Sequence, residues 1–162
     1  MNQATPYINA TTAEKNIWDL LETVCDPEVP VLTILDLGIV RAVKLNAEEV
    51  EVIITPTYSG CPAMDAISMD IRLKLAAHGY KKIRITNVLS PAWTTDWMSE
   101  NGKRKLKEYG IAAPDKRPGH LPSCPQCNSS NTKLLSQFGS TACKALYQCN
   151  DCKEPFDYFK CH

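Results

Sequence analysis

Four cysteines near the end of the chain are the residues whose spacing most clearly indicates chemistry. They form two Cys-x2-Cys units separated by twenty-one residues, and they are Cys124, Cys127, Cys149 and Cys152. Each unit can form a tight turn that directs two thiolates to one point, and the segment between the units can run out and back as a hairpin. The pattern therefore predicts a closed tetrahedral metal site. Four thiolates leave no position open for water or substrate, so the site is expected to be structural.

The predicted ion is zinc, the commoner occupant of such sites, with iron bound as in a rubredoxin-type centre as the alternative. Soft thiolates bind both metals, and no residue within the two units decides between them. Cys143 and Cys161 are further candidates for auxiliary roles at this site. Small buried side chains are the simpler interpretation for both, and no role is assigned to His162.

Another cysteine lies in a different context. The segment 55–62 leads from a predicted strand into a predicted helix, which places Cys61 at the N-terminus of that helix. The helix dipole and free backbone N–H groups would stabilise a thiolate there, making the sulfur a nucleophile or a metal ligand. Burial as a helix-capping residue is the equally weighted alternative. Asp26, in a loop with prolines, would either be solvated or approach Cys61 and share a metal with it.

Composition and charge exclude several functional classes. Hydrophobic residues make up 44% and charged residues 22% of the 162-residue chain, as in a globular protein. No apolar stretch is long enough to span a bilayer and no export signal is visible, so the protein is expected in the cytoplasm, away from membranes. Because the cytoplasm keeps thiols reduced, the eight cysteines indicate metal binding or thiol chemistry and not a disulfide framework.

The formal net charge is zero, but the charges are unevenly distributed. Residues 1–70 carry 11 acidic and 3 basic side chains, whereas residues 71–162 carry 15 basic and 7 acidic ones. The densest basic group, within 103–107, lacks the interleaved aromatic residues of a surface that binds single-stranded nucleic acid. Nucleic-acid binding is therefore not expected.

The elements that must position these residues follow from periodicity and from capping residues. The predicted order is a helix after a capping box at 11–14, strands at 39–45 and 50–55, a helix from 62 to 79, a strand at 82–88, and a short helix at 100–109 that closes over the sheet. A hairpin at 132–138 and 144–148 would carry the four cysteines. The fold class is α+β: a small mixed or antiparallel sheet with packed helices at 11–111, a proline-containing linker at 112–123, and a zinc-ribbon-like module at 124–162.

Several motifs resemble a known family. They are Asp26-Pro27-Glu28-Val29-Pro30, Asp36-Leu37-Gly38, Thr55-Pro56-Thr57-Tyr58-Ser59-Gly60-Cys61-Pro62 and Glu154-Pro155-Phe156-Asp157-Tyr158-Phe159-Lys160-Cys161. The first part resembles the MIP18 family, whose members assist iron–sulfur cluster assembly or delivery, and its motif cysteine and aspartate correspond to Cys61 and Asp26. Over nearly its whole length the chain resembles the D-subunit family of phenylacetyl-CoA epoxidase systems.

The resemblance implies a role in bacterial aerobic breakdown of phenylacetate, with the oxygenase and reductase subunits and the iron–sulfur assembly machinery as partners. It implies an accessory factor without catalytic residues of its own, in which Cys61, with Asp26, transiently holds iron or an iron–sulfur cluster. A structural subunit of the oxygenase complex is an alternative, which rests on the opposite charges of the two halves and on Trp93 and Trp97 being exposed. A small electron-transfer protein is a further alternative, if the four cysteines hold iron.

Overall fold

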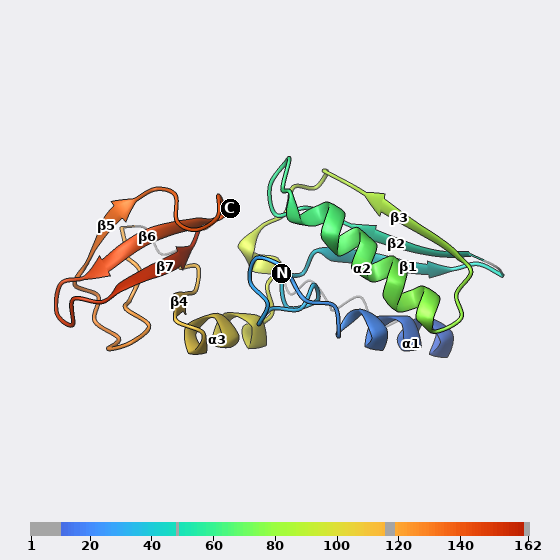
Figure 1. Ribbon diagram of the computed structural model, residues 1–162, viewed down its shortest axis with the longest axis horizontal. Helices are drawn as coiled ribbons and strands as arrows, with labels where there is room; N and C mark the ends of the chain where they lie inside the picture. Colours follow the sequence, from blue (N-terminus) through green and yellow to red (C-terminus); the bar gives the residue numbers. More distant parts are fainter. Residues whose placement is uncertain (1–10, 48, 116–118, 161–162) are drawn as a thin grey trace. The chain divides into compact units, whose positions relative to one another are not determined.

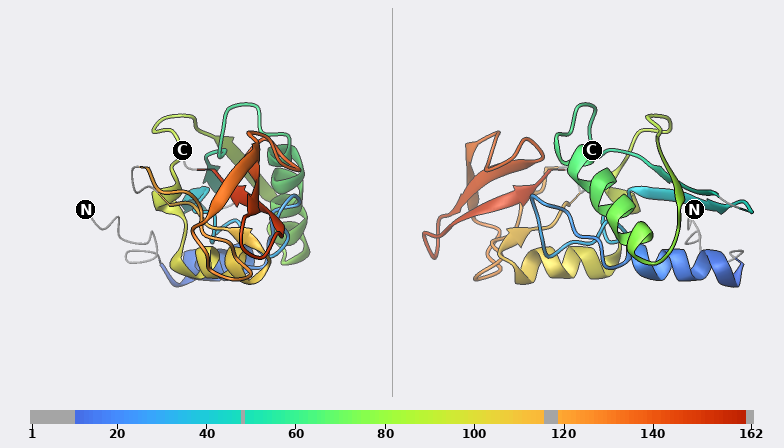
Figure 2. Two further views of the ribbon diagram at one scale, coloured as in Figure 1. Left: turned by 90° about the vertical axis from the view of Figure 1, so that its left-hand side faces the viewer. Right: turned by 45° about the vertical axis from the view of Figure 1, so that its right-hand side comes forward.

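The structure is a computed structural model that describes residues 11–47, 49–115 and 119–160. It divides into two compact units, with the boundary between Trp93 and Thr94 (Figures 1 and 2). No helix in the described part of the chain is long and apolar enough to cross a membrane.

The first unit is built on a three-stranded mixed sheet. Its elements are α1 (Thr12–Leu21), β1 (Val40–Leu45), β2 (Glu49–Ile54), α2 (Ala63–Ala77) and β3 (Lys82–Asn87). The strand order is β1-β2-β3, with β1 antiparallel and β3 parallel to β2. A parallel neighbour requires a crossover connection, and α2 supplies it. α1 packs against β1 and α2, and α2 packs against β3 (Figure 1). The predicted α+β class is confirmed.

The ends of these elements confirm the capping residues expected from the sequence. At the start of α1, the Thr11 hydroxyl accepts a hydrogen bond from the Glu14 N–H, and the Glu14 carboxylate accepts one from the Thr11 N–H. α2 starts immediately after Pro62, and Gly79 follows it with a φ of +90°, which glycine adopts without strain. The core of the unit is apolar and includes Ile17, Leu21, Leu32, Ile34, Ile39, Ile54, Ile67, Ile71 and Leu75, none of which is more than 1% exposed.

The prediction that Trp93 is exposed is wrong. Its side chain is 3% exposed, and its indole N–H donates a hydrogen bond of 2.8 Å to the carbonyl oxygen of Leu37. Trp97 is half-buried. An indole combines a large apolar ring with one donor, so it can be buried where a partner for that donor is available.

The second unit contains a four-stranded sheet, whereas the sequence predicted only a hairpin. Its elements are the short 3-10 helix η1 (Thr95–Trp97), α3 (Glu100–Glu108), β4 (Ile111–Ala112), β5 (Thr132–Ser136), β6 (Lys144–Cys149) and β7 (Pro155–Phe159). The strand order is β4-β7-β6-β5. The predicted antiparallel hairpin is confirmed as β5 and β6. β7 adds an antiparallel neighbour to β6, and β4 pairs with β7 in parallel.

The division into units differs from the predicted segmentation. Residues 94–111 were expected in the first domain, with α3 closing over its sheet, but they group with the second unit. Ala112, the first residue of the expected linker, pairs with Tyr158 of β7. Two residues are too short a stretch to show strand periodicity, which is why β4 was not predicted. That residues 11–111 and 124–162 fold independently stays a prediction.

Candidate metal centre

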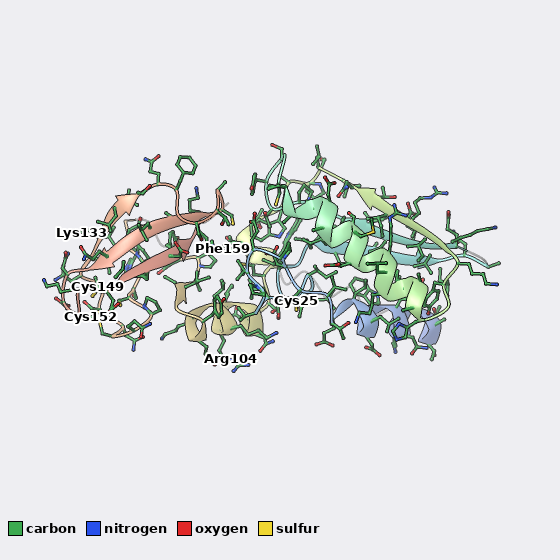
Figure 3. All side chains as sticks on the ribbon, viewed as in Figure 1. Cys25, Arg104, Lys133, Cys149, Cys152 and Phe159 are labelled. Atoms are coloured by element: carbon green, nitrogen blue, oxygen red, sulfur yellow. The ribbon has the colours of Figure 1, made fainter. Side chains whose placement is uncertain are left out.

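The structure brings the sulfur atoms of Cys124, Cys127, Cys149 and Cys152 within 4.8 Å of one another. The Sγ of Cys124 lies 3.7 Å from that of Cys152, and the Sγ of Cys127 lies 3.6 Å from that of Cys149. A tetrahedral ion with metal–sulfur bonds of about 2.3 Å places its ligands about 3.8 Å apart, so the observed separations suit such an ion. They are far longer than a disulfide bond of about 2.05 Å. Figure 3 shows Cys149 and Cys152 at one end of the sheet of the second unit, with Phe159 toward the opposite end of that sheet.

Each Cys-x2-Cys unit is held by its own backbone. In the first, the Asn128 N–H donates to the Cys124 carbonyl at 2.9 Å, and Asn128 has a φ of +60°. Asparagine tolerates this conformation better than most residues other than glycine. In the second, the Cys149 N–H donates to the Glu154 carbonyl at 2.9 Å, and Lys153 has a φ of +68°. Lys153 occupies the position equivalent to Asn128, but lysine has no preference for positive φ, so sequence reasoning missed it.

A polar network joins the two Cys-x2-Cys units, and this also escaped sequence reasoning. The Asp151 carboxylate accepts hydrogen bonds from the Ser129 hydroxyl and from the Asn131 side-chain amide, the latter at 2.8 Å. The Asn150 side-chain amide donates to the Asn131 side-chain oxygen at 2.9 Å. The hydrogen bonds from Ser129 and Asn131 lower the pKa of Asp151 from its ordinary value. Residues 129 and 131 follow the Cys124–Cys127 pair, so the network fixes the Cys149–Cys152 pair relative to it.

The thiols of the metal-free centre have different pKa values. Hydrogen bonds from the backbone N–H groups of Cys152 and Asp151 lower the pKa of Cys149 to about 7. For Cys152, the Glu154 N–H acts to lower the pKa, but loss of water and the neighbouring thiols outweigh it and raise the value to about 12. The pKa of the Cys127 thiol is also raised. Without a cation to offset their charges, the four thiols cannot all ionise near neutral pH.

The buried side of the centre is continuous with the core of the second unit. Cys124 and Cys149 are fully buried, whereas Cys127 and Cys152 are exposed. The two buried cysteines cluster with Ala112 and Phe156. Tyr147 stacks on Phe156 with ring centroids 6.0 Å apart. This cluster contains few apolar residues, so a bound metal would add to the stability of the unit.

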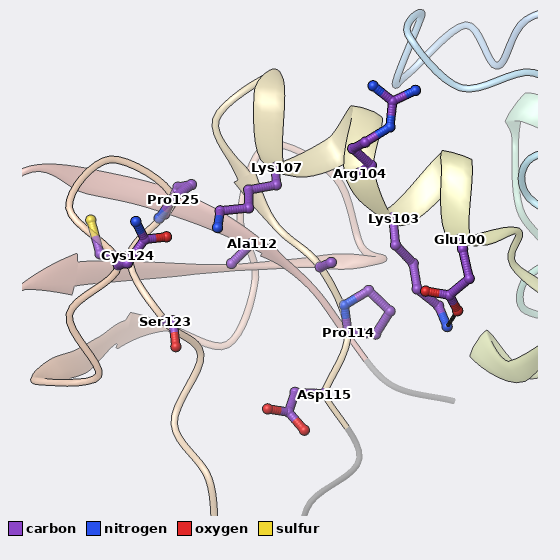
Figure 4. Close-up of a pocket in the computed structure, with 12 residues that line it drawn as sticks. Glu100, Lys103, Arg104, Lys107, Ala112, Pro114, Asp115, Ser123, Cys124 and Pro125 are labelled. Atoms are coloured by element: carbon purple, nitrogen blue, oxygen red, sulfur yellow. Dashed lines mark hydrogen bonds and ion pairs between the residues drawn. The ribbon is translucent and has the colours of Figure 1, made fainter.

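A cavity of about 510 Å³ lies beside the first Cys-x2-Cys unit (Figure 4). Its lining includes Lys103, Arg104 and Lys107 of α3, together with Cys124. Lys103 pairs with Glu100 at 2.7 Å and Arg104 with Glu108 at 3.0 Å, so much of this positive charge is neutralised within α3 itself. The cavity therefore lacks the concentrated charge that would identify an anion site.

The other predicted site residues in the described part of the chain are not members of the four-cysteine cluster. Within the described residues, neither Cys61, Asp26 nor Cys143 belongs to a group of three or more side chains placed to hold a metal. Cys143 is buried, as its simpler interpretation predicted, and its sulfur lies 3.0 Å from the Thr141 hydroxyl. Cys161 and His162 lie outside the described residues.

Cys61 and Asp26 both occupy the first unit, in the settings that the sequence indicated. Cys61 is half-buried and directly precedes Pro62 at the start of α2. Asp26 is 9% exposed, and its Oδ1 accepts hydrogen bonds of 2.8 Å from the backbone N–H groups of Glu28 and Val29. The carboxylate thus orders its own loop, which makes it more than the solvated residue of the default interpretation. A metal shared between Asp26 and Cys61 stays a prediction.

Comparisons with known proteins agree with the two parts of the chain. A family model described as iron-sulfur cluster assembly protein matches residues 14–86, and one described as PaaD zinc beta ribbon domain matches residues 114–160. A protein of Escherichia coli, described as the D subunit of a "Putative 1,2-phenylacetyl-CoA epoxidase", is 51% identical over 150 residues, which cover 90% of this chain and 91% of that protein.

Two further relatives match the first part. An "Fe-S protein maturation auxiliary factor" of Porphyromonas gingivalis is 39% identical over 95 residues, covering 57% of this chain and 90% of that protein. The crystal structure of a domain of unknown function, DUF59, from Bacillus anthracis superposes with a TM-score of 0.54 at 29% identity, covering 57% of this chain and 90% of that one. The predicted resemblance of the first part to iron–sulfur assembly proteins and the predicted zinc-ribbon-like module are both confirmed.

Proposed function

Because this chain belongs to the D-subunit family of 1,2-phenylacetyl-CoA epoxidase, we propose that it is an accessory subunit of such an epoxidase system and assists assembly or repair of a metal centre in its partner subunits. The observation that carries this proposal is that the Escherichia coli relative matches both the first and the second part of this chain. The 51% identity spans both the part matched by an iron–sulfur assembly model and the part matched by a zinc-ribbon model. The partners are the oxygenase and reductase subunits, and the clients are their iron or iron–sulfur centres.

The second unit supplies a metal-stabilised docking module in this proposal. The four cysteines hold zinc, which is structural because the thiolates fill a tetrahedral coordination shell. The sulfur separations of 3.6 and 3.7 Å support a tetrahedral ion but suit iron as well. Zinc, when bound, offsets the charge of the thiolates and fixes the two Cys-x2-Cys pairs. Asp151 orients the Cys149–Cys152 pair relative to the Cys124–Cys127 pair.

The first unit supplies the thiol that receives the iron or the cluster. Cys61 directly precedes Pro62, the N-cap of the 15-residue helix α2, and it is half-buried, so that it can meet a client without facing bulk water fully. The Asp26 loop is ordered by its own hydrogen bonds. Asp26 acts with Cys61 in this proposal, either as a second ligand or by stabilising a bound cation.

Co-expression tests the function directly. The reductase subunit of the system is produced with this protein, without it, with Cys61→Ser and with Cys25→Ser, and its iron and acid-labile sulfide are counted after purification. Cys25 is an exposed cysteine of the same unit that does not begin a helix, so it serves as the matched control. We expect the reductase to have full cluster content when it is produced with the wild type or with Cys25→Ser. Its cluster content should be reduced when it is produced with Cys61→Ser or without this protein. Equal cluster content in all four samples would refute the maturation role.

An electron-transfer function is the second candidate, because the same four sulfurs suit iron. Elemental analysis and the visible spectrum of the purified protein distinguish the two. A colourless sample with one zinc per chain excludes electron transfer at this centre, whereas a red, iron-containing sample supports it. The alternative of a purely structural oxygenase subunit has lost one of its two supporting observations, since Trp93 is buried.

A further inference from the structure

The helix α3 lies outside both family matches, but it belongs to the unit that contains the metal centre. The two family models match residues 14–86 and 114–160, whereas the second unit begins at Thr94. α3 contacts β4, and Ala112 of β4 belongs to the buried cluster that contains two of the four cysteines. α3 is therefore connected to the metal centre through the core of the second unit.

The C-terminal end of α3 faces the Cys124–Cys127 pair. A Cβ atom added at Gly110, two residues after the helix ends, would lie 3.8 Å from the side-chain nitrogen of Gln126, which stands between the two cysteines in the sequence. The cavity beside this pair is lined by Lys107 of α3 and by Cys124. In Figure 4 the Lys107 side chain extends from α3 toward Cys124. A positive charge of α3 is thus directed at the metal centre.

Lys107 differs from the other basic residues of the cavity in having no carboxylate partner. Lys103 and Arg104 are both paired with carboxylates of α3 itself. Among the residues that the structure describes, no hydrogen bond or ion pair engages the Lys107 ammonium. Asp115 adds an acidic side chain to the cavity lining, which Figure 4 shows well below Cys124 and Lys107. The charge of Lys107 is therefore available to a negatively charged group near Cys124.

The metal-loaded centre is such a group. Four thiolates carry more negative charge than one divalent ion offsets, so the loaded centre is an anion. Beside the Cys149–Cys152 pair, Asp151 and the exposed Glu154 add further negative charge. Lys153 lies there as well, but its ammonium donates to the Asn150 carbonyl at 2.5 Å and its charge acts on Asp151. The charge of the thiolates is thus left to a cation on the side of the Cys124–Cys127 pair.

From the direction of its side chain and its unengaged charge, we propose that Lys107 offsets the negative charge of the metal–thiolate centre and thereby slows metal release. Lys107 is exposed, so water weakens this attraction and the effect is modest. The competing role is stabilisation of α3 alone, because Lys105 and Lys107 both lie in its last turn, where cations favour the helix dipole. This inference rests on the metal binding proposed for the four cysteines and not on the maturation role.

Release of metal from the full-length, zinc-loaded protein to a chromogenic chelator tests the inference at two salt concentrations. Between 0.01 M and 1 M salt the Debye length falls from about 30 Å to about 3 Å, which removes attractions that act through solvent. At 0.01 M salt we expect release to be about threefold faster in Lys107→Gln and unchanged in Lys107→Arg, which keeps the charge. At 1 M salt these two variants and the wild type should release metal at the same rate.

Lys105→Gln is the matched control, because Lys105 lies in the same helical turn but does not line the cavity. It should release metal at the wild-type rate at both salt concentrations, and circular dichroism checks that every variant keeps its helices. Equal acceleration in Lys105→Gln would assign the effect to the helix dipole and overturn the inference. An acceleration in Lys107→Gln that persists at 1 M salt, or none at 0.01 M, would overturn it as well.

The same measurements separate this inference from the proposed function. A wild type that binds no metal would refute both the role of Lys107 and the metal assignment of the four cysteines. The maturation role is tested independently by the cluster content of the reductase with Cys61→Ser. Unchanged metal release in Lys107→Gln would therefore refute the role of Lys107 and leave the result of that experiment unaffected.

Discussion

The indole nitrogen of Trp93 lies 2.8 Å from the carbonyl oxygen of Leu37 and donates a hydrogen bond to it. This contact ties the last residue of the first unit to the loop that precedes β1, and both side chains are buried. Trp93→Phe would keep an aromatic ring but leave the carbonyl without this donor. The free energy of unfolding of the first unit should fall by about 1–2 kcal/mol, the typical penalty for a buried group that loses its partner.

Chemical denaturation of the full-length protein measures this change. Trp97→Phe is the matched control, since Trp97 is half-buried and also lies next to the boundary between the units. Equal effects of the two substitutions would show that the Trp93 hydrogen bond does not stabilise the first unit.

Sequence reasoning predicted the elements whose residues carry a local pattern. The capping box of Thr11 and Glu14 located α1, and the paired Cys-x2-Cys units indicated which four side chains converge. Both patterns encode a geometry within a few residues, so they need no knowledge of the tertiary fold.

Features that depend on distant segments were not predicted. β4 becomes a strand only because β7 lies beside it, and its two residues show no periodicity of their own. Trp93 is buried because the carbonyl of Leu37, fifty-six positions earlier, is available to its indole. The polar network around Asp151 likewise forms only after the two Cys-x2-Cys units have converged.

Replacement of a buried ligand should abolish the metal centre. Cys149 ends β6 and is fully buried, so Cys149→Ser removes a thiolate that no exposed residue can replace. We expect the zinc content to fall close to zero and the second unit to lose its amide dispersion in NMR spectra, because structural zinc contributes on the order of 10 kcal/mol to folding. Cys143→Ser, also at a buried cysteine but outside the cluster, should keep its metal. A Cys149→Ser protein with one tightly held zinc would contradict the assignment.

Metal affinity should rise steeply with pH. The pKa of Cys152 is raised to about 12 and that of Cys127 is also raised, so both thiols hold protons at pH 7 in the metal-free protein. Metal binding must displace at least these two protons, and the association constant should therefore rise about a hundredfold per pH unit. Competition with a chelator of known protonation between pH 6.5 and 8 measures this slope. An association constant that does not change with pH would show that the thiols are already ionised.

The Asp151 network should slow metal release. In Asp151→Asn, one carboxylate oxygen is replaced by an amide that cannot accept the hydrogen bond from Ser129 or Asn131. Loss of a residue that orients metal ligands typically changes metal affinity 10- to 100-fold, and we expect release to a chromogenic chelator to be about tenfold faster. Glu154→Gln, which replaces an exposed carboxylate three residues later, is the control. Identical release rates for the two variants would assign the network no role in holding the metal.

The pairing of β4 with β7 also has a consequence for the order of folding. Ile111 pairs with Asp157, forty-six positions later, so the unfolded chain must close a long loop to form this contact. The entropy of closure grows with loop length. A metal that joins Cys124 to Cys152 bridges most of this loop in advance and leaves only short segments free. We therefore expect the hairpin and its ion to form first in the second unit and β4 to dock last, so that β4 should be the first strand to detach when the unit begins to unfold.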